Sequence, residues 1–234
     1  MIVLKLSDVE KIYPANDTGT AQVTALSGIN LEVSTGEFVM LVGPSGSGKT
    51  TLLQISSGLD RPTRGSVWIG DLQVSHVKES ELVKLRRDDI AFVFQSHNLF
   101  PMLTAVENVE YPLIMRGVTS AEARKVSLSA LQRVGLGGRE NSRPSQMSGG
   151  QQQRVAIARA LVTRPKLIFA DEPTASLDSK SAEDLVRLFQ ELNSVEKMTF
   201  VFSTHDPRLQ PHARRVIRLV DGRVESDRPQ TPAN

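Results

Sequence analysis

The sequence contains no cysteine among its 234 residues, and only 5% of them are aromatic. The absence of cysteine excludes a disulfide-stabilised scaffold and every zinc or iron–sulfur site that requires thiolate ligands. An excess of one charge is also missing, since 28 lysines and arginines are balanced by 26 aspartates and glutamates, which leaves a formal net charge of +2. So small an excess does not favour nucleic acid or another polyanion as a partner.

Long hydrophobic runs are missing as well. Apolar runs such as 38–42 and 167–170 are much shorter than the roughly 20 residues that a helix needs to cross a bilayer. The N-terminal segment MIVLKLSDVEK meets charge within a few residues and contains no cleavable hydrophobic segment. We therefore expect the chain to be made and kept in the cytoplasm, and it is long enough to bury a hydrophobic core.

The apolar pattern predicts two kinds of strand. Residues 29–33 alternate between apolar and polar side chains, which is typical of a half-exposed antiparallel strand. In contrast, the segment FVMLV at 38–42 is apolar at every position, as expected of a parallel strand covered on both faces. The dipeptide Asp221-Gly222 predicts a two-residue hairpin. The other segments whose composition predicts strands are 2–10, 66–70, 90–94, 166–170 and 199–203.

Helices are expected mainly in the middle third of the chain. Thr104 and Glu107 have the spacing of a capping box, which starts a helix that ends near Gly117. Ser120 is expected to cap a second helix, and a third runs from about 150 to 163. Two further helices are expected, one from Lys49 to about Gly58 and one with the apolar stripe Leu185, Leu188, Phe189 and Leu192.

The segment GPSGSGKT at 43–50 matches the pattern of a P-loop, and it lies between a buried strand and the start of a helix. Its glycines allow the backbone N–H groups to surround an anion, and the helix adds the positive end of its dipole. Lys49 is placed to reach the β- and γ-phosphates of a nucleotide, and Thr50 to bind Mg²⁺. The expected phosphate-binding residues are Gly43, Pro44, Ser45, Gly46, Ser47, Gly48, Lys49, Thr50 and Thr51.

The segment LIFADE at 167–172 has four apolar residues followed by two acids. Open α/β sheets bind ligands at the carboxyl ends of their strands. Asp171 is therefore a candidate Mg²⁺ ligand, and Glu172 a candidate acceptor for the proton of an attacking water. Adjacent carboxylates after a strand are often only a solvated turn, but the P-loop in the same chain favours the catalytic interpretation.

The segment MSGGQQQRVAIARAL at 147–161 places a serine and two glycines before a helix, so it offers free N–H groups at a positive helix end. By itself this pattern also fits an ordinary glycine-rich start of a helix. However, the segment resembles the L-S-G-G-Q signature of ABC-type ATPases, with Met147 in place of the usual leucine. The resemblance implies that Ser148, Gly149, Gly150 and Gln151 contact ATP.

Four other segments resemble elements of that family, in the family's order. Gln95 resembles the glutamine of the Q-loop, which senses Mg²⁺ and the attacking water. The tripeptide at 176–178 resembles the D-loop, which implies that Asp178 belongs to the nucleotide site. His205 resembles the switch histidine that contacts the γ-phosphate, and Tyr13 the aromatic residue that stacks on adenine. The resemblance extends from about residue 2 to 225.

The resemblance implies an α/β fold, a P-loop NTPase core with a mixed, mostly parallel sheet, an antiparallel β subdomain and an inserted α-helical subdomain. We expect a single ABC ATPase domain over 1–234, with the nucleotide-binding core at 1–94 and 164–225 and the helical subdomain at 95–163. Residues 14–22 are expected to form an exposed loop, and 226–234 a disordered tail.

Within the superfamily, the stretches 26–38, 58–67 and 98–117 resemble the ATPases of the lipoprotein-releasing and macrolide-efflux type. The cell-division ATPase that works with a membrane partner at the septum belongs to the same group. Two departures occur. Thr50 replaces the commoner serine and keeps the hydroxyl for Mg²⁺. The dipeptide Ala175-Ser176 replaces a glycine-containing D-loop sequence, a change that bears on communication across the dimer.

Cassettes of the family work as head-to-tail dimers that sandwich two ATP molecules. This chain contains both halves of such a site, so a homodimer is expected. For this chain, the resemblance implies that Glu172, His205 and Gln95 are catalytic, and that Thr50, Gln95 and Asp171 surround Mg²⁺. It further implies a position at the inner face of a bacterial cell membrane, where a separate transmembrane permease docks near Gln95 to Leu103. The apolar residues that would receive the permease, or else form local core, are Leu99, Phe100, Met102 and Leu103.

The favoured function is therefore the ATP-hydrolysing subunit of a membrane complex, for export, lipoprotein or lipid extraction, or mechanotransmission. The alternative is a soluble ABC ATPase in DNA repair, translation or cofactor assembly. Soluble ABC ATPases of translation usually carry two cassettes, and those of DNA repair carry long coiled-coil or zinc insertions. This sequence contains neither feature, which favours the membrane complex. A third class, the P-loop kinases, would not explain the signature-like segment 148–151.

Overall fold

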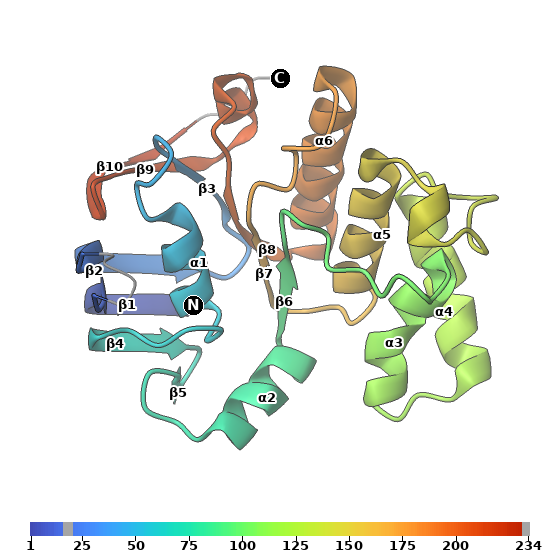
Figure 1. The fold of residues 1–234 in the computed structure, drawn as a ribbon, viewed down its shortest axis with the longest axis horizontal. Helices are drawn as coiled ribbons and strands as arrows, with labels where there is room; N and C mark the ends of the chain where they lie inside the picture. The colour runs from blue at the N-terminus through green and yellow to red at the C-terminus, as the bar shows by residue number, and fades with distance from the viewer. Residues whose placement is uncertain (16–20, 231–234) are drawn as a thin grey trace.

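The computed structural model describes residues 1–15 and 21–230, and its strands form two sheets (Figure 1). The larger sheet has the order β10-β9-β3-β8-β7-β6, and the smaller sheet the order β2-β1-β4-β5. The strands of the larger sheet are β3 (Phe38–Val42), β6 (Ile90–Val93), β7 (Leu167–Ala170), β8 (Thr199–Ser203), β9 (Arg215–Val220) and β10 (Arg223–Pro229). The strands of the smaller sheet are β1 (Ile2–Tyr13), β2 (Val23–Ser34), β4 (Arg64–Ile69) and β5 (Leu72–Gln73).

Strand pairing confirms the mixed, mostly parallel sheet. In the larger sheet, β3 is parallel to β8 and β9, and β7 is parallel to β6 and β8. The exception is β10, which runs antiparallel to β9. The smaller sheet is antiparallel between β1 and β2 and between β1 and β4, as the alternation at 29–33 predicted. The predicted P-loop NTPase architecture is therefore confirmed in both sheets.

The continuous apolar run of β3 is explained by two hydrophobic clusters on opposite sides of the larger sheet. Phe38, Met40 and Val42 belong to one cluster, together with residues of the helices. Val39 and Leu41 belong to the other, which joins this sheet to the smaller one. Alternate side chains of a strand point to opposite faces, so all five positions of β3 are buried.

The helices lie on both sides of the larger sheet. Helix α1 contacts β1, β2 and β8, whereas α3, α4 and α5 pack against one another at the opposite side of the molecule (Figure 1). The sequence pattern did not predict α2. The helices are α1 (Lys49–Ser56), α2 (Glu79–Asp88), α3 (Ala105–Met115), α4 (Ser120–Arg133), α5 (Gly149–Leu161) and α6 (Ser179–Glu196), with the short 3-10 helices η1 (Pro144–Gln146) and η2 (Pro207–His212).

The predicted start of α3 is confirmed, but that of α4 is wrong by one residue. The Thr104 N–H donates to the Glu107 carboxylate at 2.7 Å, and the Glu107 N–H donates to the Thr104 hydroxyl at 3.4 Å. At α4, Ser120 is already the first helical residue. The capping residue is Thr119, whose extended backbone allows its hydroxyl to accept the N–H of Glu122 at 3.4 Å.

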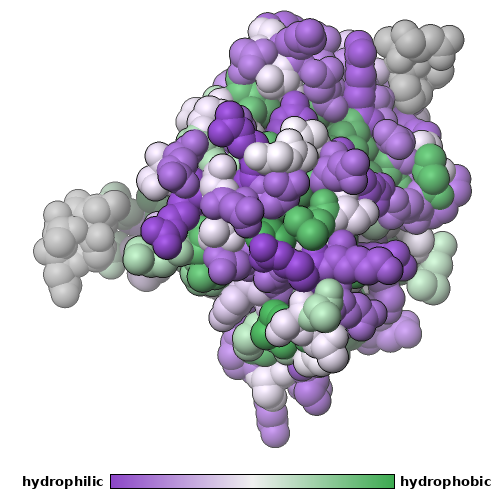
Figure 2. Space-filling model, turned by 90° about the vertical axis from the view of Figure 1, so that its right-hand side faces the viewer, coloured by the Kyte–Doolittle hydropathy of each residue, from purple (hydrophilic) through white to green (hydrophobic). Residues whose placement is uncertain are grey.

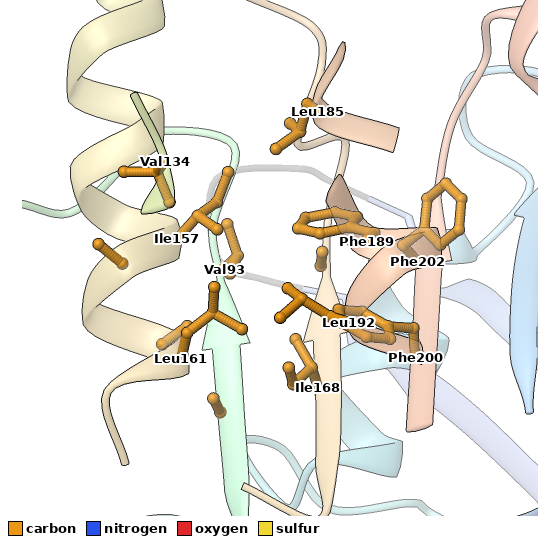
Figure 3. Packing of buried hydrophobic residues seen from close by; sticks show 14 of the residues in the cluster. Val93, Val134, Ile157, Leu161, Ile168, Leu185, Phe189, Leu192, Phe200 and Phe202 are labelled. Carbon is orange, nitrogen blue, oxygen red and sulfur yellow. The ribbon is translucent and has the colours of Figure 1, made fainter. Parts of the chain in front are cut away.

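One hydrophobic cluster connects the helical block, formed by α3, α4 and α5, to the larger sheet (Figure 3). Ile157 of α5 lies in the same cluster as Val93 of β6. From α6, Phe189 stacks on Phe200 of β8 with ring centroids 5.0 Å apart. The stripe predicted for α6 is buried at Leu185, Phe189 and Leu192, and Leu188 packs against its edge. Apolar packing therefore fixes the helices of segment 95–163 to the larger sheet.

The C-terminal prediction is partly wrong. The hairpin at Asp221-Gly222 is confirmed, with φ of 46° and 71° at its two residues. The predicted disordered tail, however, is a strand over residues 226–229, because β10 continues its pairing with β9 to Pro229. Asp227 reinforces this pairing, since its carboxylate accepts two hydrogen bonds from the Arg215 guanidinium at 2.8 and 2.6 Å. Residues 231–234 lie outside the described part of the chain.

The surface of the helical block is mostly hydrophilic, with small separated hydrophobic areas (Figure 2). Within residues 1–15 and 21–230, no helix has an apolar stretch long enough to cross a bilayer. At the predicted loop 14–22, residues 14, 15, 21 and 22 are exposed and belong to no strand, while 16–20 lie outside the described residues.

Candidate active site

The predicted P-loop forms the turn between β3 and α1, and Lys49 is the first residue of the helix. The Lys49 side chain folds back over this turn, with Nζ 2.8 Å from the Gly43 carbonyl oxygen and 3.0 Å from that of Pro44. Lys49 is only 8% exposed. No side chain caps the helix; its N-cap residue is Gly48. The turn therefore combines a buried cation with an uncapped positive helix end.

Two glycines of this turn are required because other strands approach it closely. A Cβ on Gly43 would lie 2.1 Å from the carbonyl oxygen of Leu219 in β9, and the backbone φ there is 154°. A Cβ on Gly48 would lie 2.5 Å from the carbonyl oxygen of Ala25 in β2, with φ at 100°. Both sheets thus contact the turn, and any larger residue would force the backbone apart.

The remaining phosphate-loop residues differ in exposure. Pro44, Ser45, Gly46 and Thr50 are exposed. Ser47 is buried, and its hydroxyl has no hydrogen-bond partner within the part of the chain that is described. The exposed face of the turn is therefore formed by backbone and small side chains, which leaves room for an anion.

The two acids at the end of β7 have different surroundings and share one serine. Asp171 is 7% exposed, and its Oδ1 accepts a hydrogen bond of 2.7 Å from the hydroxyl of Ser203 at the end of β8. The same hydroxyl accepts the backbone N–H of Glu172 at 2.9 Å. Ser203 therefore fixes the positions of both acids. The sequence analysis assigned no role to it, although it is the polar residue that ends an apolar strand beside β7.

Glu172 and His205 contact each other directly. The Glu172 Oε2 lies 2.8 Å from His205 Nδ1 and 3.3 Å from the His205 backbone nitrogen. Glu172 has a left-handed backbone, with φ at 47°, which is uncommon for a non-glycine residue. Its side chain is 12% exposed, whereas that of His205 is 67% exposed. The Glu172 carboxylate is thus held in place by His205, the other residue at this sheet edge that was predicted to be catalytic.

The donor set at this edge of the sheet fits Mg²⁺. This ion takes oxygen ligands and is usually held by one or two carboxylates together with substrate phosphates. The Asp171 carboxylate, the Thr50 hydroxyl and the Gln95 amide supply oxygen donors of that kind. Throughout the described residues, no group of three or more histidines, aspartates or glutamates is arranged to hold a metal ion.

The signature segment forms a separate site at the start of α5. Ser148 caps the helix by accepting the Gln151 N–H at 3.3 Å, and the Ser148 N–H donates to the Gln151 side chain at 3.0 Å. A Cβ on Gly150 would lie 2.9 Å from the Leu177 side chain, so this helix packs closely on segment 176–178. The residues around a pocket of about 310 Å³ are Ser148, Gly149, Gly150, Gln151, Arg154, Ser176, Leu177, Asp178 and Ser181, and none belongs to the phosphate loop.

Asp178 has a structural role at the start of α6. Its carboxylate accepts the Ser181 N–H at 3.0 Å and the Ser181 hydroxyl at 2.6 Å, so it caps this helix. These hydrogen bonds from Ser181 lower the pKa of Asp178 below its ordinary value. The carboxylate is therefore charged at neutral pH and oriented at the rim of the signature pocket.

The loop after β6 exposes Gln95 and is held in place by α5. Arg159 of α5 donates to the carbonyl oxygens of His97 at 2.8 Å and Asn98 at 2.6 Å. Burial lowers the pKa of Arg159 and also that of His97. The His97 ring is therefore neutral at neutral pH. The sequence analysis missed Arg159, whose side chain ties the Gln95 loop to the signature helix.

Tyr13 lies at the end of β1 with a half-exposed ring. Its hydroxyl donates to Asp60 at 3.2 Å, and the Lys11 ammonium lies 4.9 Å from the ring centroid. Although burial raises the pKa of Asp60, hydrogen bonds from Lys11 and the Arg61 N–H outweigh it and hold that pKa below its ordinary value. These contacts fix the ring at the edge of the smaller sheet.

An apolar groove of about 490 Å³ lies between α2, β6 and α3. It begins at the Gln95 loop, since Phe94 and Asn98 are among its lining residues, and it continues to Tyr111 and Met115 of α3. Of the apolar residues after Gln95, Phe100 and Met102 are exposed, whereas Leu99 packs against the core and Leu103 is half-buried. The structure therefore assigns Leu99 to the local core, and Phe100 and Met102 lie at the surface.

Asn108 holds the loop that borders this groove. This buried side chain accepts the Phe100 N–H at 2.8 Å and donates to the carbonyl oxygens of Phe100, Leu103 and Thr104 at 3.0 to 3.2 Å. We expect Asn108→Ala to lower the free energy of unfolding in urea by about 1–3 kcal/mol, because buried backbone groups lose their partners. Gln132→Ala, at an exposed amide of α4, should change it by less than about 0.5 kcal/mol. Equal effects of the two substitutions would contradict the role of Asn108.

The chain is similar in sequence to ATP-binding proteins of transporters. Residues 26–175 match the protein family described as ABC transporter. An uncharacterized ABC transporter ATP-binding protein of Thermotoga maritima is 49% identical over 223 residues, which cover 95% of this chain and 94% of that protein. The macrolide export ATP-binding/permease protein MacB of Burkholderia pseudomallei is 45% identical over 226 residues, which cover 97% of this chain and 34% of MacB.

The fold also matches that of a solved ATP-binding cassette. The dimeric post-hydrolysis state of an ATP-binding cassette bound to ADP and Pi matches with a TM-score of 0.92 and 44% sequence identity, over 97% of this chain and 99% of that chain. The chain therefore spans the full length of a solved cassette and about a third of the length of MacB.

Proposed function

The chain belongs to the ABC transporter family and is an ATPase, and we propose that two copies pair head to tail around two ATP molecules to drive a separate transmembrane protein. The observation that carries this proposal is the separation of two anion sites in one chain. The phosphate loop lies before α1, and the signature pocket at the start of α5 contains none of its residues. A two-fold axis brings each site against the other in the partner copy.

In each composite site, the phosphate loop holds the triphosphate. The backbone N–H groups from Ser45 to Gly48 surround the phosphates, with Lys49 and the hydroxyls of Thr50 and Thr51 beside them. Ser148, Gly149, Gly150 and Gln151 approach from the partner copy, with Asp178 at the rim. Mg²⁺, when bound to Thr50, Asp171 and Gln95, neutralises charge on the β- and γ-phosphates.

Glu172 accepts the proton of the attacking water. Its contact with Ser203 fixes the backbone, and its contact with His205 fixes the carboxylate, so the base needs little rearrangement. His205 is exposed on its other side and is placed to contact the γ-phosphate. Gln95 orients the water, and the Tyr13 ring stacks on adenine.

ATP-driven pairing tests this function directly. The purified chain should be monomeric without nucleotide and should form a dimer when ATP is held unhydrolysed, as measured by light scattering. The relatives described above are transporter ATP-binding proteins, so they support the membrane assembly rather than a soluble ABC ATPase. A chain that hydrolyses ATP while it remains monomeric would contradict the composite site.

The apolar groove near Gln95–Leu103 is the proposed docking surface of the permease, which would hold the chain at the inner face of the cell membrane. Macrolide export and lipoprotein release are the proposed processes, since MacB joins such a cassette to a permease in one protein. The groove has apolar walls, and its lining residue Tyr111 packs on the exposed Phe100, which extends the apolar rim. These features suit a short amphipathic helix of the permease.

We expect Phe100→Glu to prevent co-purification with the permease from detergent-solubilised membranes. Phe100 is 42% exposed and packs on Tyr111 at a centroid distance of 4.8 Å, so a charge there disrupts the apolar rim while the fold stays intact. ATP binding should not change. Val195→Glu, at an exposed position of α6, serves as the control and should retain the permease. Loss of ATP binding in Phe100→Glu would instead assign Phe100 to the local core.

A further inference from the structure

A histidine in the loop after β6 reaches a segment far away in the sequence. The His97 Nε2 lies 3.2 Å from the Ser176 hydroxyl oxygen, between β7 and α6. Ser176 also lies against the start of α5, since a Cβ on Gly149 would be 3.7 Å from the Ser176 Cβ. One hydrogen bond therefore joins the Gln95 loop to the residue that packs on the signature segment.

The backbone around His97 is fixed in an uncommon conformation. His97 and Asn98 both have left-handed backbones, with φ of 60° and 48°, which few residues other than glycine adopt. Arg159 of α5 holds both of their carbonyl oxygens, and the Ser96 hydroxyl donates to the Asn98 side chain at 2.7 Å. The His97 ring is therefore aimed at Ser176 by contacts that come from the signature helix itself.

The two ends of this hydrogen bond belong to different functional regions. On one side, Phe94 and Asn98 flank His97 in the sequence and line the docking groove. On the other side, Ser176 and its neighbour Leu177 line the signature pocket. A displacement of the loop by an occupant of the groove therefore reaches segment 176–178 through the His97–Ser176 pair, in addition to the contacts of Arg159 with the start of the same loop.

We propose that His97 is a positioning residue, which through its hydrogen bond to Ser176 sets the placement of segment 174–178 against the signature helix and so the rate of ATP hydrolysis. The inference rests on the proposed function, because the signature segment acts only in the paired ATPase. The phosphate loop lies on a different segment, so the bond contributes to turnover and little to ATP binding.

The test uses His97→Phe, Ser176→Ala and the double variant of the full chain, with kcat and KM for ATP measured separately. Each single variant should lower kcat by about two- to tenfold, the range of one lost hydrogen bond, with KM nearly unchanged. The double variant should be no slower than the slower single variant, because both remove the same bond. His97→Gln retains an amide nitrogen and should restore most of the rate when Ser176 is present, and none of it when Ser176 is alanine.

His76→Phe makes the same change at an exposed histidine and should leave kcat unchanged. The inference would be overturned if the fold-losses in kcat of the two single variants multiplied in the double variant. It would also be overturned by a change confined to KM, or by an unchanged kcat in Ser176→Ala. Ser176 is exposed, so its alanine variant keeps the fold and gives an answer even if His97→Phe unfolds. A wild-type chain that neither hydrolyses ATP nor pairs with it would overturn the proposed function instead.

Discussion

The substitution Glu172→Gln is expected to lower ATP turnover by about 100-fold or more while ATP binding is retained. The amide cannot accept the proton of the attacking water, and a general base contributes about this much to a rate. The glutamine has the shape of glutamate, so the contact with Ser203 through the backbone is preserved. ATP is then held unhydrolysed between two chains, and we expect a stable dimer in size-exclusion chromatography with light scattering.

Glu191→Gln is the matched control, since it makes the same change at an exposed carboxylate of α6. It should hydrolyse ATP at the wild-type rate and should not accumulate as a dimer. Turnover near the wild-type rate in Glu172→Gln would remove Glu172 from the mechanism. Loss of ATP binding would instead mean that this residue supports the site structurally.

The substitution Ser148→Arg is expected to abolish ATP-driven pairing and to lower hydrolysis by about 100-fold or more, the effect of losing a group that stabilises the transition state. The change removes the capping interaction with Gln151 and places a cation at the positive end of α5. It also fills a pocket of about 310 Å³ that would receive the partner's ATP. Nucleotide affinity, measured with a fluorescent ATP analogue, should stay near the wild-type value because the phosphate loop is intact.

Ser120→Arg makes the same change in the first turn of α4, away from both anion sites. It should pair and hydrolyse ATP as the wild-type chain does. If Ser148→Arg binds ATP and still forms dimers, the signature segment does not contribute to the dimer interface, and the composite site is wrong.

The predicted parts of the fold are those that local patterns specify. The all-apolar run of β3 is buried on both faces, and the capping box at Thr104 starts α3. The charged segment 226–229 was expected to be disordered. It is a strand because Arg215 is available across the hairpin to pair with Asp227, and such a distant partner is invisible in a local pattern.

In the candidate site, too, contacts between distant segments could not be predicted from local sequence patterns. Its P-loop and acids were predicted from residue patterns, whereas the signature and His205 were predicted from the family resemblance; the structure brings Glu172 and His205 together. Ser203, Arg159 and His97 were not predicted as parts of the site, because their partners lie in other segments. Helix α2 was also missed. Its sequence is mostly polar, with only Leu82 and Leu85 buried, so the apolar periodicity is weak.

The contacts of the phosphate loop have a consequence for the order in which the protein is completed during synthesis. The loop follows β3, whose two neighbours are β8, which begins at Thr199, and β9. The hairpin beyond β9 then closes on the loop, where the Gly222 N–H donates to the Ser47 carbonyl at 3.1 Å. On the ribosome, both edges of the strand that carries the loop therefore stay unpaired until β8 and β9 have emerged. We therefore expect nucleotide to stabilise the nascent chain only after residues 199–222, which complete the surroundings of the loop, have been synthesised.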